Sequence, residues 1–352
     1  MHSAFPVSSR LLLDAPNVHT GGGLVLLQAM LADWPADLPM WAWLDARAQG
    51  QLPLPAAAQV HWVRATPIAR LAGELSLVRE ARAGDRVLCF HGLPPLLPNS
   101  AENIVFLQNL HYLGNIDLRE STRWVRWRQR FERALFRLGR SRVASYWVQT
   151  PTMARELRAW WPQMPVPVRT LPYALPIGAP SQDHGERWDF VYVADGEPHK
   201  NHRSLVEAWK LLAAEGLRPS LALTLPARNS VLSLWVRAQA QQYGLRIEDL
   251  GPLPHAEVLA LYGRAGALVF PSRGESFGLP LFEARELGLP IVASERDYVR
   301  DICQPAQTFD PESPVSIARA IRRHLGLREA TVAPVSALEF LRAIAGEGQS
   351  AS

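Results

Sequence analysis

The sequence predicts an α/β protein with two parallel-sheet domains that face each other across a cleft. Its 352 residues exceed what one ordinary hydrophobic core accommodates, so two domains are expected. Short apolar runs alternate with helical patterns through both halves of the chain, as in parallel α/β sheets. A proline-rich stretch at residues 162–180 separates the halves, because proline at this density is excluded from central strands and helix interiors.

In the first half, a predicted strand at residues 10–15 is followed by a loop at 16–22 and an apolar helix that starts near Gly23. Further apolar runs predict strands at residues 60–63, 86–90, 103–108 and 145–150. We expect these elements to form a first domain of residues 1–172.

The second half repeats this architecture without repeating its sequence. Strands are predicted at residues 188–194, 221–225, 247–251, 267–271 and 290–294, and helices at 204–214, 231–243, 257–263 and 280–287. They define a second domain of residues 173–334, and a last helix is expected within residues 335–352. Ligands bind such sheets outside the carboxyl ends of the strands, so functional motifs are expected on strand-to-helix turns.

The amino-acid composition excludes several classes of protein. Hydrophobic residues at 48% and charged residues at 20% exclude a disordered chain and a coiled coil. The two cysteines, Cys89 and Cys303, cannot build a disulfide scaffold or a four-ligand zinc site. No apolar run approaches the roughly 20 residues of a membrane span, and the amino terminus lacks the pattern of an export signal. We expect a reduced, cytoplasmic chain.

The positive charge is concentrated in one segment. Nine arginines and two glutamates lie between Arg119 and Arg142, a net charge of +7, so the remainder of this +4 chain carries −3. This distribution argues against nucleic-acid binding. An apolar stripe at helical spacing runs through the segment: Trp124, Trp127, Phe131, Leu135 and Leu138. Such a helix can lie on the anionic inner leaflet of a membrane. Alternatively, the stripe packs on the sheet and the arginines are solvated.

The strongest motif spans residues 274–290 and follows the strand at 267–271. It opens a helix with Pro280 near its first turn. Free backbone amides at this helix start offer an anion site, formed by Ser276, Phe277, Gly278 and Leu279. Glu275 and Glu283 flank the site and can accept hydrogen bonds from ligand hydroxyls, which suits a sugar nucleotide. Alternatively, Glu275 is a helix-end acid and Glu283 a solvated surface residue.

A second motif, at residues 191–209, places cations at a helix start: His199, Lys200, His202 and Arg203. Each opposes the helix dipole by about 0.3–1 kcal/mol unless a bound anion lies among them. We therefore expect a pyrophosphate near Lys200; otherwise the lysine points to solvent. The two histidines have no evident carboxylate partner, and no Asp-x-Asp loop is found, so no metal site is expected.

Three glycines at residues 21–23 follow the first strand. Glycine permits positive φ and close approach of the backbone to a ligand, and Gly22 and Gly23 are the expected contacts; loop flexibility alone is the alternative. They are not a dinucleotide-binding fingerprint, because Leu26 stands at the position of its third glycine. In the second domain, Pro252 and Leu253 are expected to frame the base of a nucleotide.

Residues 271–294 closely resemble the glutamate–seven residues–glutamate signature of retaining glycosyltransferases of family 4, which have the GT-B fold of two Rossmann-like domains. The sequence around Lys200 is similar to a subgroup that assembles bacterial surface polysaccharide and O-antigen. The resemblance implies transfer of a sugar, with retention, from a UDP- or GDP-linked donor to a glycan acceptor that is lipid-linked at the inner leaflet. It implies no metal and no other cofactor.

The resemblance also assigns roles to residues. Glu275 would hold the sugar hydroxyls, Glu283 the ribose, and Lys200 the donor pyrophosphate. Family members place an arginine some five residues before this lysine, where this chain has Asp195. The candidates for the second positive charge are Arg203 and Arg273.

In the first domain, family members often carry a histidine near the transferring sugar. Gln108 and Asn109 take this place and His111 follows, so Asn109 and His111 are catalytic candidates beside Glu275 and Lys200. Ordinary loop hydrogen bonding is the alternative for both. The resemblance further implies that the helix within residues 335–352 crosses back to the first domain.

Two other functions remain open on the sequence. A sugar-nucleotide epimerase of GT-B form would need a carboxylate and histidine set in the cleft, which the sequence does not assemble. A non-catalytic membrane-binding protein built on the arginine segment would leave the spacing of Glu275 and Glu283 without a role.

Overall fold

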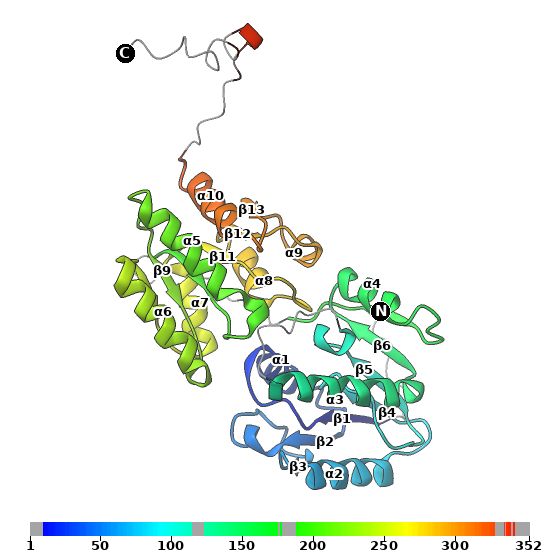
Figure 1. Cartoon of the computed structure of the whole chain (residues 1–352). Helices are drawn as coiled ribbons and strands as arrows, with labels where there is room; N and C mark the ends of the chain where they lie inside the picture. The colour runs from blue at the N-terminus through cyan, green and yellow to red at the C-terminus, as the bar shows by residue number, and fades with distance from the viewer. Residues whose placement is uncertain are drawn as a thin grey trace.

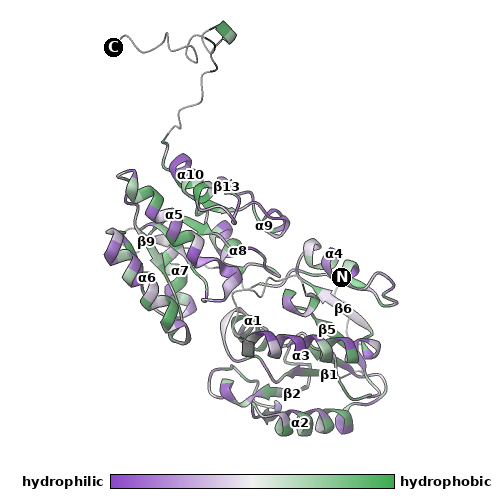
Figure 2. Ribbon diagram, in the orientation of Figure 1, coloured by the Kyte–Doolittle hydropathy of each residue, from purple (hydrophilic) through white to green (hydrophobic). Residues whose placement is uncertain are grey.

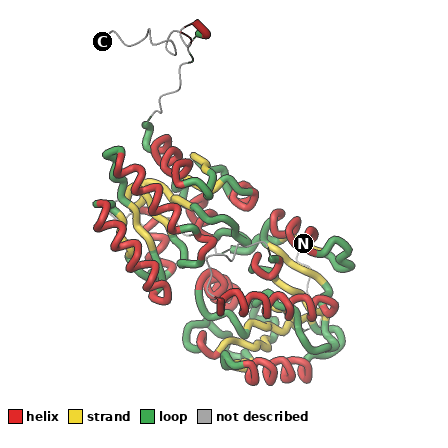
Figure 3. Tube along the Cα trace, viewed as in Figure 1, coloured by secondary structure: helices red, strands yellow, loops and turns green. Residues whose placement is uncertain are grey.

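A computed structural model describes residues 10–114, 123–174, 177, 188–327, 334, 336–338 and 341. Two domains lie side by side, each a parallel sheet covered by helices (Figures 1 and 3). The first sheet has the strand order β3-β2-β1-β4-β5-β6-β7 and the second the order β10-β9-β8-β11-β12-β13. The predicted architecture of two parallel-sheet α/β domains is confirmed.

The first sheet contains every strand predicted for it and two more. Its strands are β1 (Leu11–Ala15), β2 (Met40–Asp45), β3 (Gln59–Val63), β4 (Arg86–Cys89), β5 (Glu102–Phe106), β6 (Ser145–Val148) and β7 (Val168–Thr170). The sequence did not predict β2 and β7. Strand β7 lies within the proline-rich stretch, but at the edge of the sheet, where neighbouring prolines do not interrupt a ladder.

The helices of the first domain are α1 (Gly21–Ala32), α2 (Pro67–Glu80), α3 (Arg123–Gly139) and α4 (Pro151–Trp160). The side chains of Thr66 and Thr150 cap α2 and α4 by accepting hydrogen bonds from backbone amides. Leu77 of α2 and Phe136 of α3 belong to one buried cluster, whereas Leu27 of α1 belongs to another. Helices α2 and α3 therefore cover the same face of the sheet, opposite to α1.

The second domain contains every predicted element and three more, α9, β13 and α10. Its strands are β8 (Trp188–Tyr192), β9 (Leu221–Leu223), β10 (Ile247–Asp249), β11 (Ala265–Phe270), β12 (Ile291–Ser294) and β13 (Gln307–Phe309). Its helices are α5 (His202–Ala214), α6 (Ser230–Tyr243), α7 (His255–Gly263), α8 (Leu279–Glu286), α9 (Asp297–Ile302) and α10 (Pro314–His324). The helices alternate hydrophobic and hydrophilic residues and bury their apolar faces on the sheet (Figure 2).

Polar and apolar contacts hold the two domains together. The hydroxyl of Thr150 donates to the carbonyl of Ser276 at 3.2 Å, and the backbone amide of Thr152 donates to Oδ2 of Asp301 at 2.8 Å. Leu279 of the second domain packs against the core of the first. These contacts fix the edge of the first sheet against the start of α8 and against α9.

The apolar stripe of α3 does not pack on the sheet along its length. Trp127, Phe131 and Leu138 are exposed, whereas Phe136 is completely buried. Packing of the whole stripe was one of two alternatives, and it is wrong for these three side chains. The side chain of Trp124 lies outside the described part of the chain.

The last predicted helix falls largely outside the described residues. Within residues 335–352 only 336–338 and 341 are described, so the crossing of this helix to the first domain stays a prediction. Among the described residues, no helix is long and apolar enough to cross a membrane.

Candidate active site

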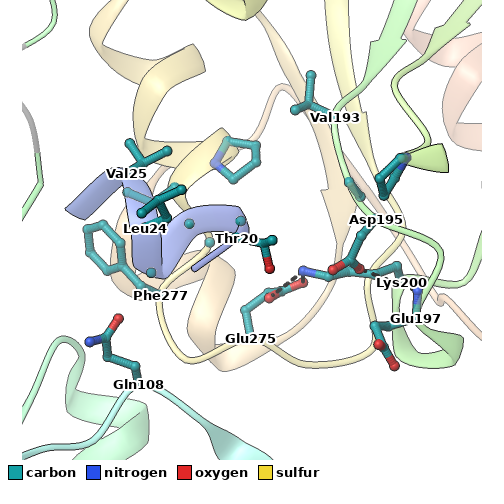
Figure 4. A pocket seen from close by; sticks show the side chains of 18 of the residues that line it. Thr20, Leu24, Val25, Gln108, Val193, Asp195, Glu197, Lys200, Glu275 and Phe277 are labelled. Atoms are coloured by element: carbon teal, nitrogen blue, oxygen red, sulfur yellow. Dashed lines mark hydrogen bonds and ion pairs between the residues drawn. The ribbon is translucent and has the colours of Figure 1, made fainter. Parts of the chain in front are cut away.

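A cavity of about 910 Å³ lies between the two domains, within the roughly 300–1,000 Å³ typical of small-molecule sites. Its walls come from the carboxyl ends of strands in both sheets, as predicted, and Figure 4 shows part of the lining. In the second sheet, β8 and β11 are neighbours, and their following loops carry Lys200 and Glu275. Neighbouring strands whose connections leave in opposite directions are the usual ligand site of such sheets.

The loop before α8 presents its backbone to the cavity. Residues Glu275, Ser276, Phe277 and Gly278 line the cavity. Gly278 has φ +83°, which an L side chain rarely adopts, and Pro280 follows in the first turn of the helix. Within the described residues, no backbone or side-chain oxygen accepts a hydrogen bond from the amides of Ser276, Phe277 or Gly278. The loop is thus suited to bind an anion at a helix amino terminus.

Lys200 and Glu275 form an ion pair inside the cavity (Figure 4). The Lys200 Nζ lies 2.8 Å and 2.9 Å from the two carboxylate oxygens of Glu275, and the Ser272 hydroxyl donates to the same carboxylate at 2.6 Å. Burial opposes the charge of Lys200, but Glu275 and Asp195 outweigh it and raise the pKa of the ammonium. The cavity therefore contains a lysine that stays charged at neutral pH.

A strained backbone position supports Lys200. The next residue, Asn201, has φ +63°, and its side-chain amide donates to the carbonyls of Pro271 and Pro311 at 3.1 Å and 2.7 Å. The Tyr192 hydroxyl donates to the carbonyl of Lys200 at 2.7 Å. Residues held in this region of φ cost energy and persist where surrounding contacts impose them. These hydrogen bonds fix the loop that carries the ammonium group.

Glu283 is buried inside α8, the helix that follows this loop, and lines the cavity. The Nε2 of His255 lies 2.8 Å from one of its carboxylate oxygens, and the Tyr262 hydroxyl donates to the other at 3.1 Å. The hydrogen bond that His255 donates to Glu283 raises the pKa of this imidazole. The alternative that Glu283 is a solvated surface residue is therefore wrong. Sequence reasoning missed His255 and Tyr262, although His255 lies only two residues after the predicted Leu253.

The three glycines lie at the start of α1 rather than before it. Gly21, with φ +66°, is its first residue, and Gly22 and Gly23 line the cavity. A Cβ on Gly22 would lie 3.0 Å from the Cδ1 of Leu279. The glycines thus let the first domain approach the start of α8 closely.

The first domain contributes polar side chains opposite Lys200. Gln108, Asn109 and His111 line the cavity, and the amide of Gln108 donates to the carbonyl of Phe90 at 2.7 Å. The Nε2 of His111 lies 3.3 Å from a carboxylate oxygen of Glu132 on α3. Sequence reasoning missed Glu132, whose only signal was its place among arginines. Both catalytic candidates of this domain therefore face the cavity.

Two predicted cations are not among the residues that line the cavity. The guanidinium of Arg203 stacks over Trp235 at 4.6 Å from the ring centre, and Arg273 pairs with Glu312 at 3.1 Å. Their roles toward the pyrophosphate therefore stay predictions. Asp195 does line the cavity, as do Pro252 and Leu253. Burial lowers the pKa of His199, another lining residue, so this imidazole is neutral at neutral pH.

Among the residues that the structure describes, no group of histidine, cysteine or carboxylate side chains is arranged to hold a metal ion. The cavity is instead lined by one partly buried lysine, backbone amides and carboxylates. This set can bind a diphosphate through Lys200 and the amides, and hydroxyl groups through Glu275 and Glu283.

The two sheets and the cleft between them define a GT-B glycosyltransferase fold. WaaG, described as a glycosyltransferase involved in lipopolysaccharide biosynthesis, has this fold: its structure matches with a TM-score of 0.61 over 90% of each chain at 17% identity. Residues 179–333, which include the second domain, match the family glycosyl transferases group 1.

Two mannosyltransferases each match a part of the chain. The serotype-specific mannosyltransferase WbdA of Escherichia coli is 32% identical over 149 residues, which are 42% of this chain and 18% of that protein. The O-antigen chain mannosyltransferase B of Escherichia coli is 37% identical over 108 residues, 30% of this chain and 28% of that protein. The match thus spans less than a third of either relative.

Proposed function

We propose that this protein is a retaining, metal-independent glycosyltransferase that moves a hexose from a nucleotide sugar to a glycan during surface-polysaccharide or lipopolysaccharide assembly. The observation that carries the proposal is the set of Lys200, Glu275 and unpaired loop amides in one cavity between two GT-B domains. The family of the second domain and the O-antigen relatives support it.

Each cavity group has a role in the proposed reaction. Lys200 and the amides of Ser276–Leu279 hold the diphosphate, Glu275 the sugar hydroxyls, and Glu283 the ribose. The bond between the anomeric carbon and the leaving phosphate oxygen breaks, while the acceptor hydroxyl oxygen bonds that carbon on the same face. The acceptor proton passes to the departing phosphate oxygen, so no side-chain nucleophile is required. Lys200 and the amides stabilise the charge that develops on the diphosphate.

The first domain would receive the acceptor. Asn109 and His111 face Lys200 across the cavity and are proposed to contact the transferring sugar and the attacking hydroxyl. The acceptor is proposed to be a glycan on a lipid carrier at the inner leaflet of the membrane, because the arginine-rich helix α3 also borders the cavity through Arg128 and Gln129.

The donor is tested first by thermal unfolding with UDP, GDP or dTDP. One nucleotide is expected to raise the free energy of unfolding, by about 2.7 kcal/mol at a concentration 100 times its Kd. Absence of a shift with all three would contradict the proposed donor site.

The reaction is tested with the matching nucleotide sugar. The glycoside formed is expected to keep the anomeric configuration of the donor, as shown by NMR, and its rate is expected to be unchanged by EDTA. An inverted product or loss of activity with EDTA would overturn the mechanism. Conversion of the donor to an epimer without any acceptor would favour the epimerase instead.

A further inference from the structure

Helix α3 turns a polar face toward the first-domain wall of the cavity and an apolar face toward solvent. The exposed face carries three large apolar side chains: Trp127, Phe131 and Leu138. The opposite face carries four polar residues on successive turns: Arg128, Gln129, Glu132 and Arg133. An amphipathic helix normally buries its apolar side, so the reversed orientation in this half of α3 indicates a role for the polar face.

Gln129 shows that this face is directed at a ligand. The residue lines the cavity and is only 7% exposed, and within the described part of the chain no group donates a hydrogen bond to its side-chain Oε1. A buried acceptor that is left unpaired costs about 1–3 kcal/mol. A hydroxyl group of a molecule in the cavity can supply the missing donor.

The backbone of His111 is fixed on α3 without any contribution from Glu132. His111 belongs to the short 3-10 helix η2 (Leu110–Leu113), and the Nε of Arg133 donates to its carbonyl at 2.6 Å. The ring of His111 lies edge-on to that of Tyr112, with 4.4 Å between centres, and Tyr112 stacks on Phe136 of α3 at 5.7 Å. The state of the imidazole is therefore what Glu132 can still determine.

Glu132 contacts one nitrogen of this imidazole. The Nε2 of His111 lies 3.3 Å from the Oε2 of Glu132, and the two side chains are 18% and 25% exposed. A carboxylate only accepts hydrogen bonds, so it favours the tautomer in which the proton is on Nε2. The other nitrogen, Nδ1, then has a lone pair that can accept a hydrogen bond. A carboxylate partner of this kind fixes both the tautomer and the orientation of a histidine ring.

His111 lies within electrostatic reach of the donor side of the cavity. It lines the cavity together with His199 and Lys200 of the second domain. Burial lowers the pKa of His199, and smaller contributions in the same direction come from Lys200 and His111. The imidazole of His111 therefore faces the place where the proposed diphosphate and the transferring sugar meet.

We infer that Glu132 is a positioning residue, which holds the proton of His111 on Nε2 and so presents the lone pair of Nδ1 to a sugar hydroxyl. This inference rests on the function proposed above. In that reaction the single proton of the attacking hydroxyl passes to the departing phosphate oxygen, so the hydroxyl that Nδ1 binds is a different one. It belongs to the transferring sugar or to the acceptor sugar.

The position of the proton can be measured on the whole chain without donor or acceptor. Long-range proton–nitrogen correlation spectra of histidine-labelled protein at alkaline pH distinguish the two neutral tautomers, and the signals lost in His111→Ala identify His111. We expect the tautomer with the proton on Nε2. A proton on Nδ1 in the wild-type protein would overturn the inference, because the lone pair would then face Glu132.

The effect on transfer is measured with Glu132→Gln, which keeps the size of the side chain and removes its charge. With the nucleotide sugar found in the thermal screen and an octyl mannoside as acceptor, kcat/KM should fall about tenfold, the effect of one hydrogen bond to a charged group. In a His111→Ala background the same substitution should change kcat/KM less than about twofold, because Glu132 acts through the imidazole. Glu102→Gln, which breaks a 3.1 Å ion pair with Arg86 elsewhere in this domain, is the matched control and should leave kcat/KM unchanged.

Calorimetric titration of Glu132→Gln identifies the sugar that carries the hydroxyl. Its affinity for the free nucleotide should equal that of wild type, since Lys200 and the loop amides are intact. A weaker affinity for the nucleotide sugar would assign the hydroxyl to the transferring sugar. An unchanged affinity for the nucleotide sugar, with a raised KM for the acceptor, would assign it to the acceptor.

Wild-type kinetics in Glu132→Gln would overturn the inference. Additive losses in Glu132→Gln and His111→Ala, or a weaker affinity of Glu132→Gln for the free nucleotide, would also overturn it and assign Glu132 a structural role. A wild-type protein that transfers no sugar is a different result. It contradicts the proposed function, on which the inference rests, and is recognised without any variant.

Discussion

The ion pair between Lys200 and Glu275 joins the two side chains on which the proposed chemistry depends most. Their side chains are 18% and 10% exposed, so each charge depends on the other for compensation. Removing one partner of a buried pair costs about 3–5 kcal/mol, because the remaining charge is left uncompensated. Stability and catalysis are therefore coupled at this site, and a single substitution cannot separate them.

A double substitution separates the effect on stability from the effect on catalysis. Lys200→Met is expected to lower the Tm strongly and to abolish transfer. Adding Glu275→Gln removes the uncompensated charge, so that the Tm should recover in large part while transfer stays absent. Thermal unfolding and a transfer assay on the two single variants and the double variant measure this. A double variant as unstable as Lys200→Met would contradict the coupling.

The pair of His255 and Glu283 predicts a pH dependence. The hydrogen bond raises the pKa of His255 above 6.5, its ordinary value, so the protonated imidazole is favoured in the folded state. Its contribution to the free energy of unfolding is complete below about pH 6.5 and is lost as pH rises through the higher pKa. His255→Gln should therefore destabilise the protein below this window and less above it.

The difference in Tm between wild type and His255→Gln, measured across pH 5 to 9, isolates this effect. Burial lowers the pKa of His202 to about 3, which destabilises both proteins alike as pH falls below 6.5, and this background cancels in the difference. A difference in Tm that does not change with pH would show that His255 acts only by packing. The donor Kd should follow the same window if Glu283 binds the ribose.

Individual residues of the site divide into those that a local motif predicts and those that only the fold brings together. Glu275 and Lys200 lie in strand-to-helix turns and Glu283 lies in the helix after one of them, and the local sequence indicates all three positions. His255 is 28 residues from Glu283, and Glu132 is 21 residues from His111. Such partners meet only through packing of separate elements, which no spacing within one motif indicates. The same limit explains Arg203 and Arg273, whose partners Trp235 and Glu312 could not be identified in advance.

At the scale of elements, the two ends of α8 offer a controlled comparison. Gly278 and Gly288 both have positive φ, +83° and +68°, and a Cβ on Gly288 would meet nothing within 4 Å. A side chain in this conformation costs about 1–2 kcal/mol. Gly278→Ala and Gly288→Ala should therefore destabilise the protein similarly, but Gly278→Ala should also weaken nucleotide binding about tenfold or more, because the anion loop must shift.

Calorimetric titration measures the affinity of the Gly278→Ala and Gly288→Ala variants for the nucleotide found in the thermal screen. At Gly278 the added Cβ also meets the Cδ1 of Leu281 at 3.1 Å, whereas Gly288 is absent from the cavity lining. Equal affinities in the two variants would show that the loop backbone does not hold the nucleotide.

Length alone does not decide which strands could be predicted, because β9 and β10 have three residues each and were predicted, whereas β2 has six and was not. The buried runs that became β8 and β11 stand out because parallel strands covered on both faces are continuously apolar. Strands β7 and β13 each contain a single apolar residue among three, so no apolar run marks them, and they exist through pairing with β6 and β12. Helix α1 was predicted to start near Gly23, but it starts at Gly21. The sequence did not indicate this boundary, because the glycines have no side chain that could cap the helix.

At the scale of the whole molecule, the sequence predicted two facing domains but not how they touch. The resemblance to GT-B enzymes implied a cleft, and the cavity lies there. The contacts that set the relative position of the domains involve Thr152 of α4 and Asp301 of α9, elements that the sequence did not predict. Domain placement depends on such single contacts between distant parts of the chain, so it follows from the structure alone.

Two contacts between α4 and α9 differ in their expected contribution to stability. Asp301 accepts a hydrogen bond from the amide of Thr152, in the first turn of α4, where a carboxylate is favoured by about 0.5–2 kcal/mol. Arg155 and Asp297 form an ion pair at 2.9 Å with side chains 55% and 77% exposed, and such surface pairs contribute about 0–1 kcal/mol. The first contact should therefore hold the domains in place and the second should not.

Asp301→Ala is accordingly expected to uncouple the domains, and Arg155→Ala is the matched control. In differential scanning calorimetry the unfolding transition of the Asp301→Ala variant should broaden or split into two. Saturating nucleotide should then raise the Tm of the second domain's transition only. Its KM for the donor should rise, because the glycines of α1 no longer stay against Leu279, whereas Arg155→Ala should behave as wild type in both measurements. A single sharp transition in the Asp301 variant, shifted as a whole by nucleotide, would show that apolar contacts such as that of Leu279 suffice to fix the two domains.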